Sequence, residues 1–320
     1  MKLKRLYTFI NFDLDIIEKA LEETIQAEHP VLKEASMHLL QAGGKRIRPV
    51  FVLLSGKFGN YNIDEIKNVA VALELIHTAS LVHDDVIDNA ELRRGGLTVK
   101  AKWDNRIAMY TGDYIFARAV ELMTTINKIE AHQVLSKTMV ELVIGEIEQI
   151  KDKYNWDQNL RTYFRRIKRK TAILIAVSCE LGAIVSGAPI QIQRQLYQFG
   201  YNVGMAFQIT DDILDFTGTE KELGKPAGSD LQQGNITLPV LYALRNETLR
   251  KEIITNFDPN NEGKMRHIIS LVKTSGGIEY SKEISEHYLK KAHGIIKELP
   301  NCKEKTALLN IAKYIGKRKF

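Results

Sequence analysis

Apolar residues recur along this chain at steps of three and four positions, the spacing that places them on one face of an α-helix. The repeat is clear at residues 14–25, 69–81 and 192–203, and strict alternation of apolar and polar residues over strand lengths is scarce. The seven prolines fall between long helical segments, where breaks are expected. The pattern predicts an all-α fold, a large helical bundle made by a single domain over residues 1–320.

The composition is that of an ordinary globular protein. Hydrophobic residues make up 44% of the chain, which is enough for a sizeable core. The most apolar stretch, residues 172–187, lacks the roughly 18 apolar residues of a membrane span and predicts a buried helix. Cys179 and Cys302 lie far apart and indicate no disulfide framework. Asn11 and Asp13 follow the basic start too closely for a signal peptide, so we expect a soluble, cytoplasmic protein and leave peripheral membrane attachment open.

The formal net charge of +6 suits nucleic acid, anionic lipid or a small molecule that carries phosphate. The chain has no zinc-ligand spacing, no basic and aromatic sheet pattern and no low-complexity arm. Nucleic acid is therefore not expected as a partner, and most of the charges are expected to lie on solvated helix faces.

One short acidic pattern occurs twice in apolar sequence. Each copy places three aspartates within five residues: Asp84, Asp85 and Asp88 in the first motif, and Asp211, Asp212 and Asp215 in the second. Each residue of a helix turns by about 100°, so the three carboxylates of a copy fit one arc. Their desolvation needs compensation, and such hard oxygen ligands suit Mg²⁺ together with phosphate oxygens and water. The repetition predicts two metal-binding walls around one anionic ligand.

Basic residues gather near both motifs in the sequence. They are Lys45, Arg46 and Arg48 after a pair of glycines, Arg93 and Arg94 after the first motif, Lys170 at the end of a basic run over residues 161–170, and Lys225 after the second motif. A diphosphate requires this mixture of Mg²⁺ on one side and Arg or Lys on the other. We expect most of the 161–170 run to be a solvated face, and Arg46 could equally be a structural or surface charge. His77 shares the helix face of Asp84, either as a core residue or as a diphosphate contact.

In order and spacing, these residues resemble the trans-isoprenyl diphosphate synthases, from about residue 30 to residue 245. More narrowly, residues 38–46, 145–154 and 312–320 resemble the large catalytic components of two-component heptaprenyl diphosphate synthases. The resemblance implies the isoprenoid synthase fold, a helical bundle around a deep central cavity with both aspartate motifs at its mouth.

The resemblance also implies roles for individual residues. It implies that the six aspartates and Lys170 are catalytic, and that the aspartates hold about three Mg²⁺ ions. Contacts to the allylic diphosphate are expected from Arg93, Lys170, Thr171, Gln208 and Lys225, and contacts to isopentenyl diphosphate from Lys45, Arg48, His77 and Arg94. The chain departs from its relatives at Asn235, where many carry lysine, and at Leu97, where proline is usual. We expect Lys225 to matter more as a result of the first, and only a loop difference from the second.

The activity that the resemblance implies is Mg²⁺-dependent elongation of an allylic diphosphate, expected to be farnesyl diphosphate, with isopentenyl diphosphate. The expected product is all-trans heptaprenyl diphosphate (C35) for the side chain of menaquinone, delivered to the membrane. Hexaprenyl or other lengths, or a short geranylgeranyl-type product, are the alternatives. A smaller first component, a second copy of this chain, or both are expected as protein partners.

Proteins of other classes explain the motifs less well. A terpene cyclase normally carries one aspartate-rich motif and a different second metal motif. A non-catalytic regulatory subunit loses the aspartates, and a basic protein that binds membrane or nucleic acid needs no paired metal motifs. The second intact motif therefore favours chain elongation.

Product length is expected to be set beneath the first motif. In this family, bulky aromatic residues four or five positions before the motif stop growth early, and here those positions hold Ser80 and Ala79. Small residues that merely allow close helix packing are the alternative reading. We expect Ala79→Phe or Ser80→Phe to shorten the product to about three or four isoprene units, because the new ring fills the tunnel. Chromatography of the products measures this, and an unchanged length distribution would contradict it.

Overall fold

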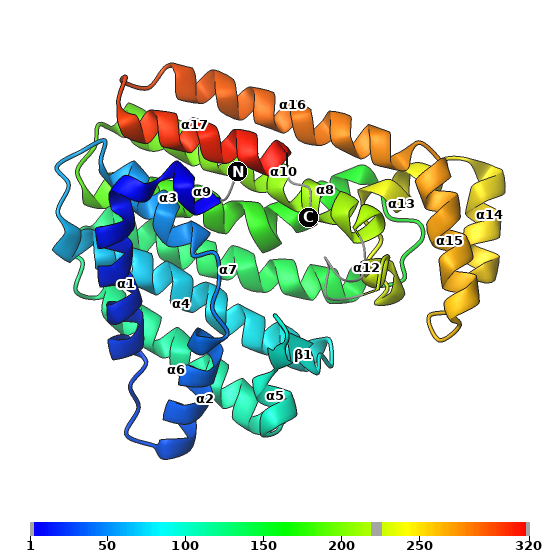
Figure 1. The fold of residues 1–320 in the computed structure, drawn as a ribbon, viewed down its shortest axis with the longest axis horizontal. Helices are drawn as coiled ribbons and strands as arrows, with labels where there is room; N and C mark the ends of the chain where they lie inside the picture. Colours follow the sequence, from blue (N-terminus) through cyan, green and yellow to red (C-terminus); the bar gives the residue numbers. More distant parts are fainter. Residues whose placement is uncertain (1–2, 219–225, 318–320) are drawn as a thin grey trace. The chain divides into compact units, whose positions relative to one another are not determined.

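The computed structural model describes residues 3–218 and 226–317, and their regular structure is almost entirely helical (Figure 1). Within this part of the chain the strands are β1 (Leu92–Arg93) and β2 (Gly96–Leu97), which pair antiparallel as a short hairpin. The all-α prediction is confirmed. No helix among the described residues combines the length and the apolar character that crossing a bilayer requires.

The chain forms two compact units, and each is described by itself. Unit 1 consists of Met1–Ser136, Val177–Tyr197 and Pro300–Leu308, and unit 2 consists of Lys137–Ala176, Gln198–Leu299 and Leu309–Phe320. The single domain over residues 1–320 stays a prediction.

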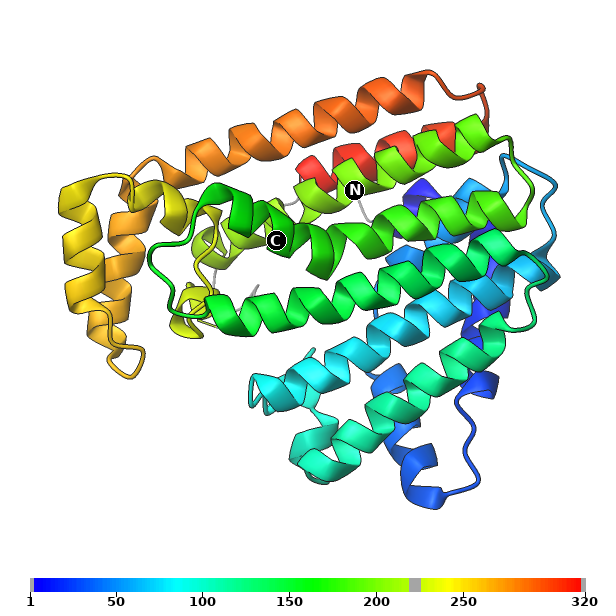
Figure 2. The same ribbon diagram turned by 180° about the vertical axis from the view of Figure 1, so that it is seen from behind.

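Unit 1 is built around helix α4. Its elements are η1 (Leu3–Leu6), η2 (Thr8–Ile10), α1 (Asn11–Thr24), α2 (Pro30–Gln41), α3 (Ile47–Gly56), α4 (Ile63–Ile87), the hairpin, α5 (Val99–Lys102) and α6 (Asn105–Met123). Helix α4 packs against α1, α3 and α6, and it runs beside α6 in Figure 2. Residues 69–73 of α4 are fully buried, which covers more than a whole turn. A polar group on this part of α4 therefore needs a partner from the protein.

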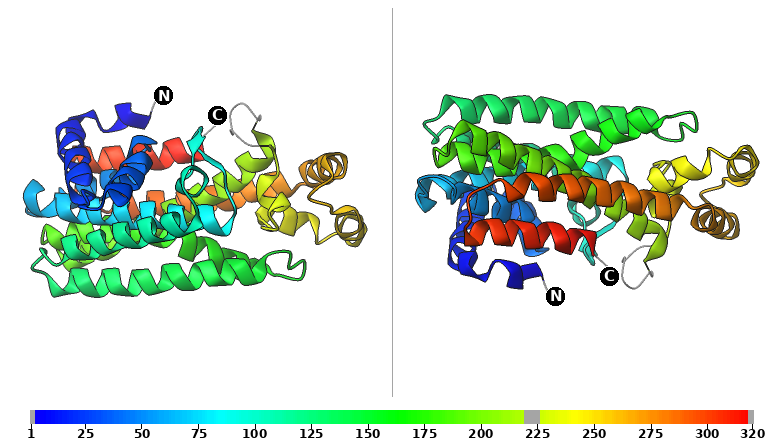
Figure 3. Two further views of the ribbon diagram at one scale, coloured as in Figure 1. Left: turned by 90° about the horizontal axis from the view of Figure 1, so that it is seen from below. Right: turned by 90° about the horizontal axis from the view of Figure 1, so that it is seen from above.

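Unit 2 holds the second aspartate motif. Its short elements are α8 (Leu160–Ile167), a π-helical turn η3 (Lys168–Ala172), α12 (Ser229–Gln232) and α13 (Leu238–Ala243), and its longer ones are α14 (Glu247–Asn256), α15 (Glu262–Thr274) and α16 (Gly277–Lys297). Helices α14 and α15 lie side by side in both views of Figure 3. The core joins Ile209, Ile213 and Phe216 to Tyr163 and Leu238, so it supports the helix face that carries the motif.

Four helices contribute residues to both units: α7 (Ile129–Asp152), α9 (Ile173–Val185), α10 (Ile190–Thr217) and α17 (Lys303–Gly316). Helix α9 confirms the buried helix predicted from residues 172–187. Within unit 1 it closely approaches α3, because a Cβ on Gly182 would lie 2.3 Å from the carbonyl oxygen of Val52.

Candidate active site

The first aspartate motif ends helix α4. Asp84 and Asp85 lie in its last turn, and Asp88 is the C-cap, whose N–H donates to the carbonyl of Asp84 at 2.8 Å. Asp85 is only 2% exposed, whereas Asp84 and Asp88 are partly exposed. The end of α4 therefore offers two carboxylates one turn apart and buries the third.

The β1–β2 hairpin brings an arginine back to that buried carboxylate. Its two-residue turn is Arg94–Gly95, both with positive φ (54° and 80°), a conformation that suits a tight hairpin. Arg93 on β1 donates through Nε at 2.7 Å to Oδ1 of Asp85, and its Nη2 lies 2.6 Å from the same oxygen. Burial raises the pKa of Asp85, and the Arg93 guanidinium opposes that rise.

The hairpin was not expected from the sequence, which predicted only a loop difference around Leu97–Thr98. Leu97 lies on β2, and its carbonyl oxygen is 2.7 Å from Nε2 of His38 in α2. Thr98 is the N-cap of α5 and accepts from the N–H of Ala101 at 3.1 Å. These contacts fix the hairpin to its own unit on both sides.

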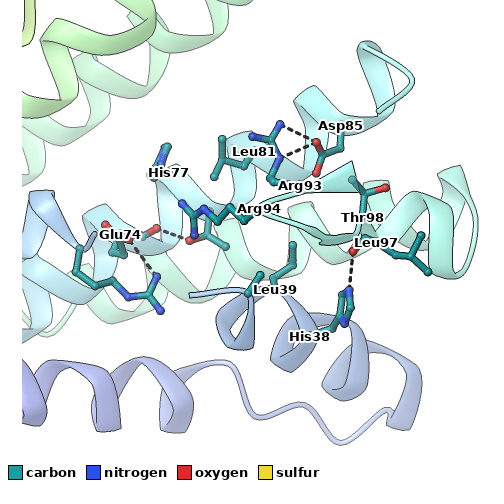
Figure 4. A pocket seen from close by; sticks show the side chains of 13 residues that line it. His38, Leu39, Glu74, His77, Leu81, Asp85, Arg93, Arg94, Leu97 and Thr98 are labelled. Carbon is teal, nitrogen blue, oxygen red and sulfur yellow. Dashed lines mark hydrogen bonds and ion pairs between the residues drawn. The ribbon is translucent and has the colours of Figure 1, made fainter. Parts of the chain in front are cut away.

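A pocket of unit 1 lies beside the hairpin (Figure 4). Residues of α2, α4, the hairpin and the loop before α3 line it: His38, Leu39, Ala42, Arg46, Glu74, His77, Thr78, Leu81, Asp85, Arg93, Arg94, Leu97 and Thr98. Four predicted site residues, His77, Asp85, Arg93 and Arg94, are thereby brought together. Of the other two predicted isopentenyl diphosphate contacts, Arg48 is buried in the first turn of α3 and Lys45 is exposed on the preceding loop.

The electrostatics of this pocket favour an anion. Burial, and then the charges of Arg48 and Arg94, hold the pKa of His77 well below its usual range, so His77 is neutral at physiological pH. Burial lowers the pKa of Arg48 to about 10, which leaves it charged. Its Nε is buried without a hydrogen-bond partner, although a buried donor normally has one. Arg46, Arg93 and Arg94 line the pocket itself, and a pocket lined by guanidinium groups fits a phosphate.

The second aspartate motif lies wholly within α10, as predicted. Asp212 is 2% exposed and accepts from the Tyr163 hydroxyl at 2.6 Å and from Nε2 of Gln208 at 2.9 Å. The Thr171 hydroxyl donates to Oε1 of Gln208 at 2.6 Å, so three donors form one polar chain. Burial raises the pKa of Asp212 to about 7, against the lowering effect of Tyr163.

Asp215 is buried in the same way, whereas Asp211 is partly exposed. Asp215 accepts from the Ser229 hydroxyl at 2.9 Å and from the N–H of Asp230 at 3.2 Å. Helix α12 is thus joined to the motif through its first residues. The second motif therefore buries two carboxylates and leaves one partly exposed, whereas the first buries one and leaves two partly exposed.

Lys170 and Thr171 lie on the π-helical turn η3, a type of distortion that is frequent at functional sites. Lys170 forms an ion pair with Glu146 of α7, with Nζ and Oε2 3.2 Å apart. Gly145 lets α7 approach this turn, because a Cβ there would lie 2.6 Å from Cβ of Arg169. The turn therefore brings a cation and a hydroxyl, adjacent in sequence, into one region of unit 2.

The prediction that most of the 161–170 run is a solvated face is wrong. Only Arg161 and Arg165 among its basic residues are exposed. Arg166 is 5% exposed and donates to Oε1 of Gln158 at 3.0 Å and to the carbonyl of Ile236 at 2.6 Å. The sequence carried one signal for this burial. Arg166 follows Tyr163 by three residues, so the two side chains lie on the same face of the helix.

The structure shows the burial of the predicted chain-length residues and of Asn235. Ala79 is buried, and Ser80 is partly buried with its hydroxyl donating to the carbonyl of His77 at 2.8 Å. Asn235 is partly buried, and its Oδ1 has no hydrogen-bond partner. Lys225 lies outside the described residues.

The aspartates fit a divalent cation by their chemistry. Residues 3–218 and 226–317 hold no cluster of three His, Cys, Asp or Glu side chains that could already bind a metal ion. Asp84, Asp88 and Asp211 are nevertheless hard oxygen ligands at partly exposed positions, which suits Mg²⁺. The other three carboxylates are buried and held by protein donors. The assignment of all six as metal ligands stays a prediction.

Sequence reasoning missed Glu74 and Tyr163. Glu74 lies in the pocket of unit 1 and is 3% exposed. It stands eleven residues, about three helical turns, before Asp85, so the helical period already places both on one face. Tyr163 gives no comparable signal, because its contact with Asp212 depends on packing between residues 49 positions apart.

Comparison with known proteins places these observations in a family. The family model described as polyprenyl synthetase matches residues 29–273. The chain is 62% identical over 320 residues to "Heptaprenyl diphosphate synthase component 2" of Bacillus subtilis (strain 168), covering 100% of this chain and 92% of that protein. It is 37% identical to a "Prenyl transferase" of Synechocystis sp. (strain ATCC 27184 / PCC 6803 / Kazusa), over 97% of each chain.

Two solved structures are similar throughout. The crystal structure of heptaprenyl diphosphate synthase from Staphylococcus aureus matches with a TM-score of 0.93 and 43% identity, over 97% of this chain and 98% of that one. A polyprenyl synthase from Caulobacter crescentus CB15, complexed with calcium and isoprenyl diphosphate, matches with a TM-score of 0.92 and 30% identity, over 99% and 98%. Both motifs lie within the matched family region.

The raised pKa of Asp212 makes a pH-dependent prediction for the metal-free protein. An unfolded aspartate titrates at about 3.9, whereas Asp212 in the fold titrates at about 7. The folded chain therefore holds a proton that the unfolded chain loses over this range, and the free energy of unfolding falls as pH rises. Tyr163→Phe removes a donor that stabilises the carboxylate, so we expect it to lower Tm by about 2–4 °C more at pH 8 than at pH 5.

Thermal denaturation in EDTA at the two pH values measures this difference. Tyr280→Phe is the matched control, because the Tyr280 hydroxyl accepts from Arg245 at 3.3 Å on the exposed side of the unit. Its effect on Tm should be the same at both pH values. An equal loss at pH 5 and pH 8 for Tyr163→Phe would contradict the role assigned to its hydroxyl.

Proposed function

The chain belongs to the polyprenyl synthetase family and is a prenyltransferase that elongates prenyl chains; from this premise we propose that it extends farnesyl diphosphate with isopentenyl diphosphate to all-trans heptaprenyl diphosphate. The observation that carries the assignment of the two substrates is the cationic pocket of unit 1 next to the first aspartate motif. The 62% identity to a heptaprenyl diphosphate synthase component supports the product. Use of the product for menaquinone, and its delivery to a membrane, belong to the same proposal.

Isopentenyl diphosphate binds at the pocket of unit 1 in this proposal. Arg94 on the hairpin turn lines the pocket and supplies a guanidinium, and Arg48, buried at the start of α3 outside the lining residues, adds a second positive charge. His77 is neutral and therefore donates or accepts a hydrogen bond without adding charge. Lys45, exposed on the neighbouring loop, completes the set as a compact positive charge. These groups hold the diphosphate so that the double bond of the substrate acts as the nucleophile.

For the allylic diphosphate, the proposal keeps the roles that the family resemblance implies for the aspartate motifs, Arg93 and Lys170. Within each motif, the partly exposed carboxylates would hold Mg²⁺: Asp84 and Asp88 in unit 1, and Asp211 in unit 2. Bound Mg²⁺ would neutralise the charge that develops on the departing diphosphate. Arg93 and Lys170 add positive charge on the protein side, and each already has a carboxylate partner that orients it.

The reaction then follows from charge placement. Stabilising the leaving diphosphate lets the allylic C–O bond break, and the allylic cation is attacked by the double bond of isopentenyl diphosphate. Loss of one proton, taken by the departing diphosphate, regenerates an allylic product one isoprene unit longer. Apolar walls exclude water, which would otherwise quench the cation. The small residues Ala79 and Ser80 leave room for a long product beneath the first motif.

We further propose that the chain works with a smaller first component, because its relatives are named as second components. The surface for that partner is the outward face of α7, where large apolar side chains recur at helical spacing: Val140, Val143, Ile144, Ile147 and Ile150. Val143 and Ile147 are 61% and 62% exposed. Such a stripe on a soluble surface marks an interaction site.

The charges of α7 support this choice of face. Glu141 and Glu148 pair with Arg169, and Glu146 pairs with Lys170, all within unit 2. The acidic residues of this segment are thus engaged by its own chain, and the stripe itself is uncharged. An uncharged helix face of this kind packs well against another apolar surface.

A radiochemical assay tests the proposed reaction. Purified chain, with and without the candidate first component, is incubated with labelled isopentenyl diphosphate, farnesyl diphosphate and Mg²⁺. We expect label in an apolar product of about seven isoprene units, abolished by EDTA. Arg48→Gln should raise the KM for isopentenyl diphosphate more than that for farnesyl diphosphate. Incorporation independent of a divalent cation, or none with any partner, would refute the proposal.

The α7 face makes a separate prediction. Ile147→Glu places a charge in the stripe without touching the core, so we expect it to abolish assembly with the first component, and with it the partner-dependent activity. Light scattering after gel filtration measures assembly. Ile190→Glu is the matched control, because Ile190 is 61% exposed on α10. Assembly that survives Ile147→Glu would show that the partner binds elsewhere, and a dimer of the chain alone that dissociates would identify a second copy as the occupant.

A further inference from the structure

Glu74 is a buried carboxylate among arginines. It lies in the middle of α4, is 3% exposed and lines the pocket of unit 1 (Figure 4). A buried carboxylate is costly unless protein donors satisfy it. Only one of its oxygens is satisfied, since Oε1 accepts from Nη1 of Arg46 at 3.2 Å while Oε2 is buried without a partner.

Arg46 is fixed as a structural bridge rather than available to a ligand. Its backbone is left-handed, with φ 47°. Its Nε and Nη2 donate to the two carboxylate oxygens of Glu18 in α1, at 2.7 and 3.3 Å, while its Nη1 reaches Glu74 in α4. Of the sequence-predicted readings of Arg46, the structural one is confirmed. The loop before α3 is therefore pinned between two helices through one guanidinium.

Three guanidinium groups share Glu74 as a nearby negative charge. Burial lowers the pKa of Arg48 and of Arg94, and the negative charge of Glu74 opposes that lowering; Glu74 also contributes to the raised pKa of Arg46, while Arg94 and Arg46 repel one another. The crowding is visible at Gly44, where a Cβ would lie 2.9 Å from Nη1 of Arg94 and 3.3 Å from Nη1 of Arg46. Without a carboxylate among them, like charges at this separation would move apart.

We propose that Glu74 is a positioning residue for the isopentenyl diphosphate site: it holds Arg48 and Arg94 near each other, through charge and through Arg46, in the arrangement that receives the diphosphate. The inference rests on the proposed function, and it adds a residue to which the sequence assigned no role. Glu74 itself does not contact substrate. It acts through the arginines. Its negative charge by itself opposes the binding of an anion.

Because of this opposition, the two possible roles of Glu74 predict opposite changes in diphosphate affinity. If Glu74 contributed only its charge, Glu74→Gln would make the pocket more positive and tighten diphosphate binding. If Glu74 positions the arginines, the same change lets them separate and weakens binding. We expect Glu74→Gln to raise the KM for isopentenyl diphosphate about tenfold and leave that for the allylic substrate within about twofold. Glu74→Asp keeps the charge and should recover part of the loss.

Glu18→Gln is the matched control, because Glu18 binds the same arginine from a side chain that is 45% exposed. We expect its KM values to stay within about twofold of wild type. Binding of inorganic diphosphate in EDTA, measured by calorimetry, provides a readout without turnover and should weaken in Glu74→Gln but not in Glu18→Gln. Failure of the wild-type assay refutes the proposed function. The comparison of these variants tests the positioning role of Glu74 separately.

Unchanged or tighter binding by Glu74→Gln overturns the proposal, as does an equal rise in both KM values. If circular dichroism shows that Glu74→Gln does not fold, Glu74→Asp decides alone. A KM for isopentenyl diphosphate unchanged in Glu74→Asp then overturns the proposal, because shortening the side chain must displace the arginines. A selective rise supports it.

Discussion

Helix α4 buries two carboxylates about three turns apart, and an arginine from another segment donates to each one. Glu74 takes Arg46 from the loop before α3, and Asp85 takes Arg93 from the hairpin. An unpaired acid in this core would cost several kcal/mol. The loop before α3 and the hairpin are therefore held in place because these two buried carboxylates of α4 need donors, and the pocket that both segments line follows from that requirement.

The second motif solves the same problem with neutral donors. Tyr163 and Gln208 donate to Asp212, and Ser229 donates to Asp215. Lys170 on η3 is paired with Glu146 of α7. In both motifs, some aspartates are buried and accept hydrogen bonds from the protein, while others are partly exposed. Residues of the same type therefore differ in how accessible they are to a cation.

The sequence predicted the helical fold and the helices that carry both motifs, because carboxylates in apolar sequence of period 3.6 permit few other readings. It could not predict the hairpin, since strands of two residues show no alternation. Arg166 was misjudged because composition alone made its run look solvated, while Tyr163 on the same side of the helix indicated burial. Contacts such as Arg46 with Glu74, 28 positions apart, depend on tertiary packing that local pattern does not encode.

The π-helical turn at Lys168–Ala172 has a consequence for how this chain can vary. Residues 160–185 are helical without interruption, and the turn accommodates more residues than an α-helical turn would. The five residues of this turn rotate the chain about as far as four residues of an α-helix do, so the extra residue leaves the later positions of α9 in phase. Removing one residue there would therefore restore regular winding, and the buried face of α9 would keep its direction. The deletion would instead change the local arrangement of Lys170 and Thr171, so the length of the chain at this turn is tied to these two side chains and not to the packing of the helix that follows.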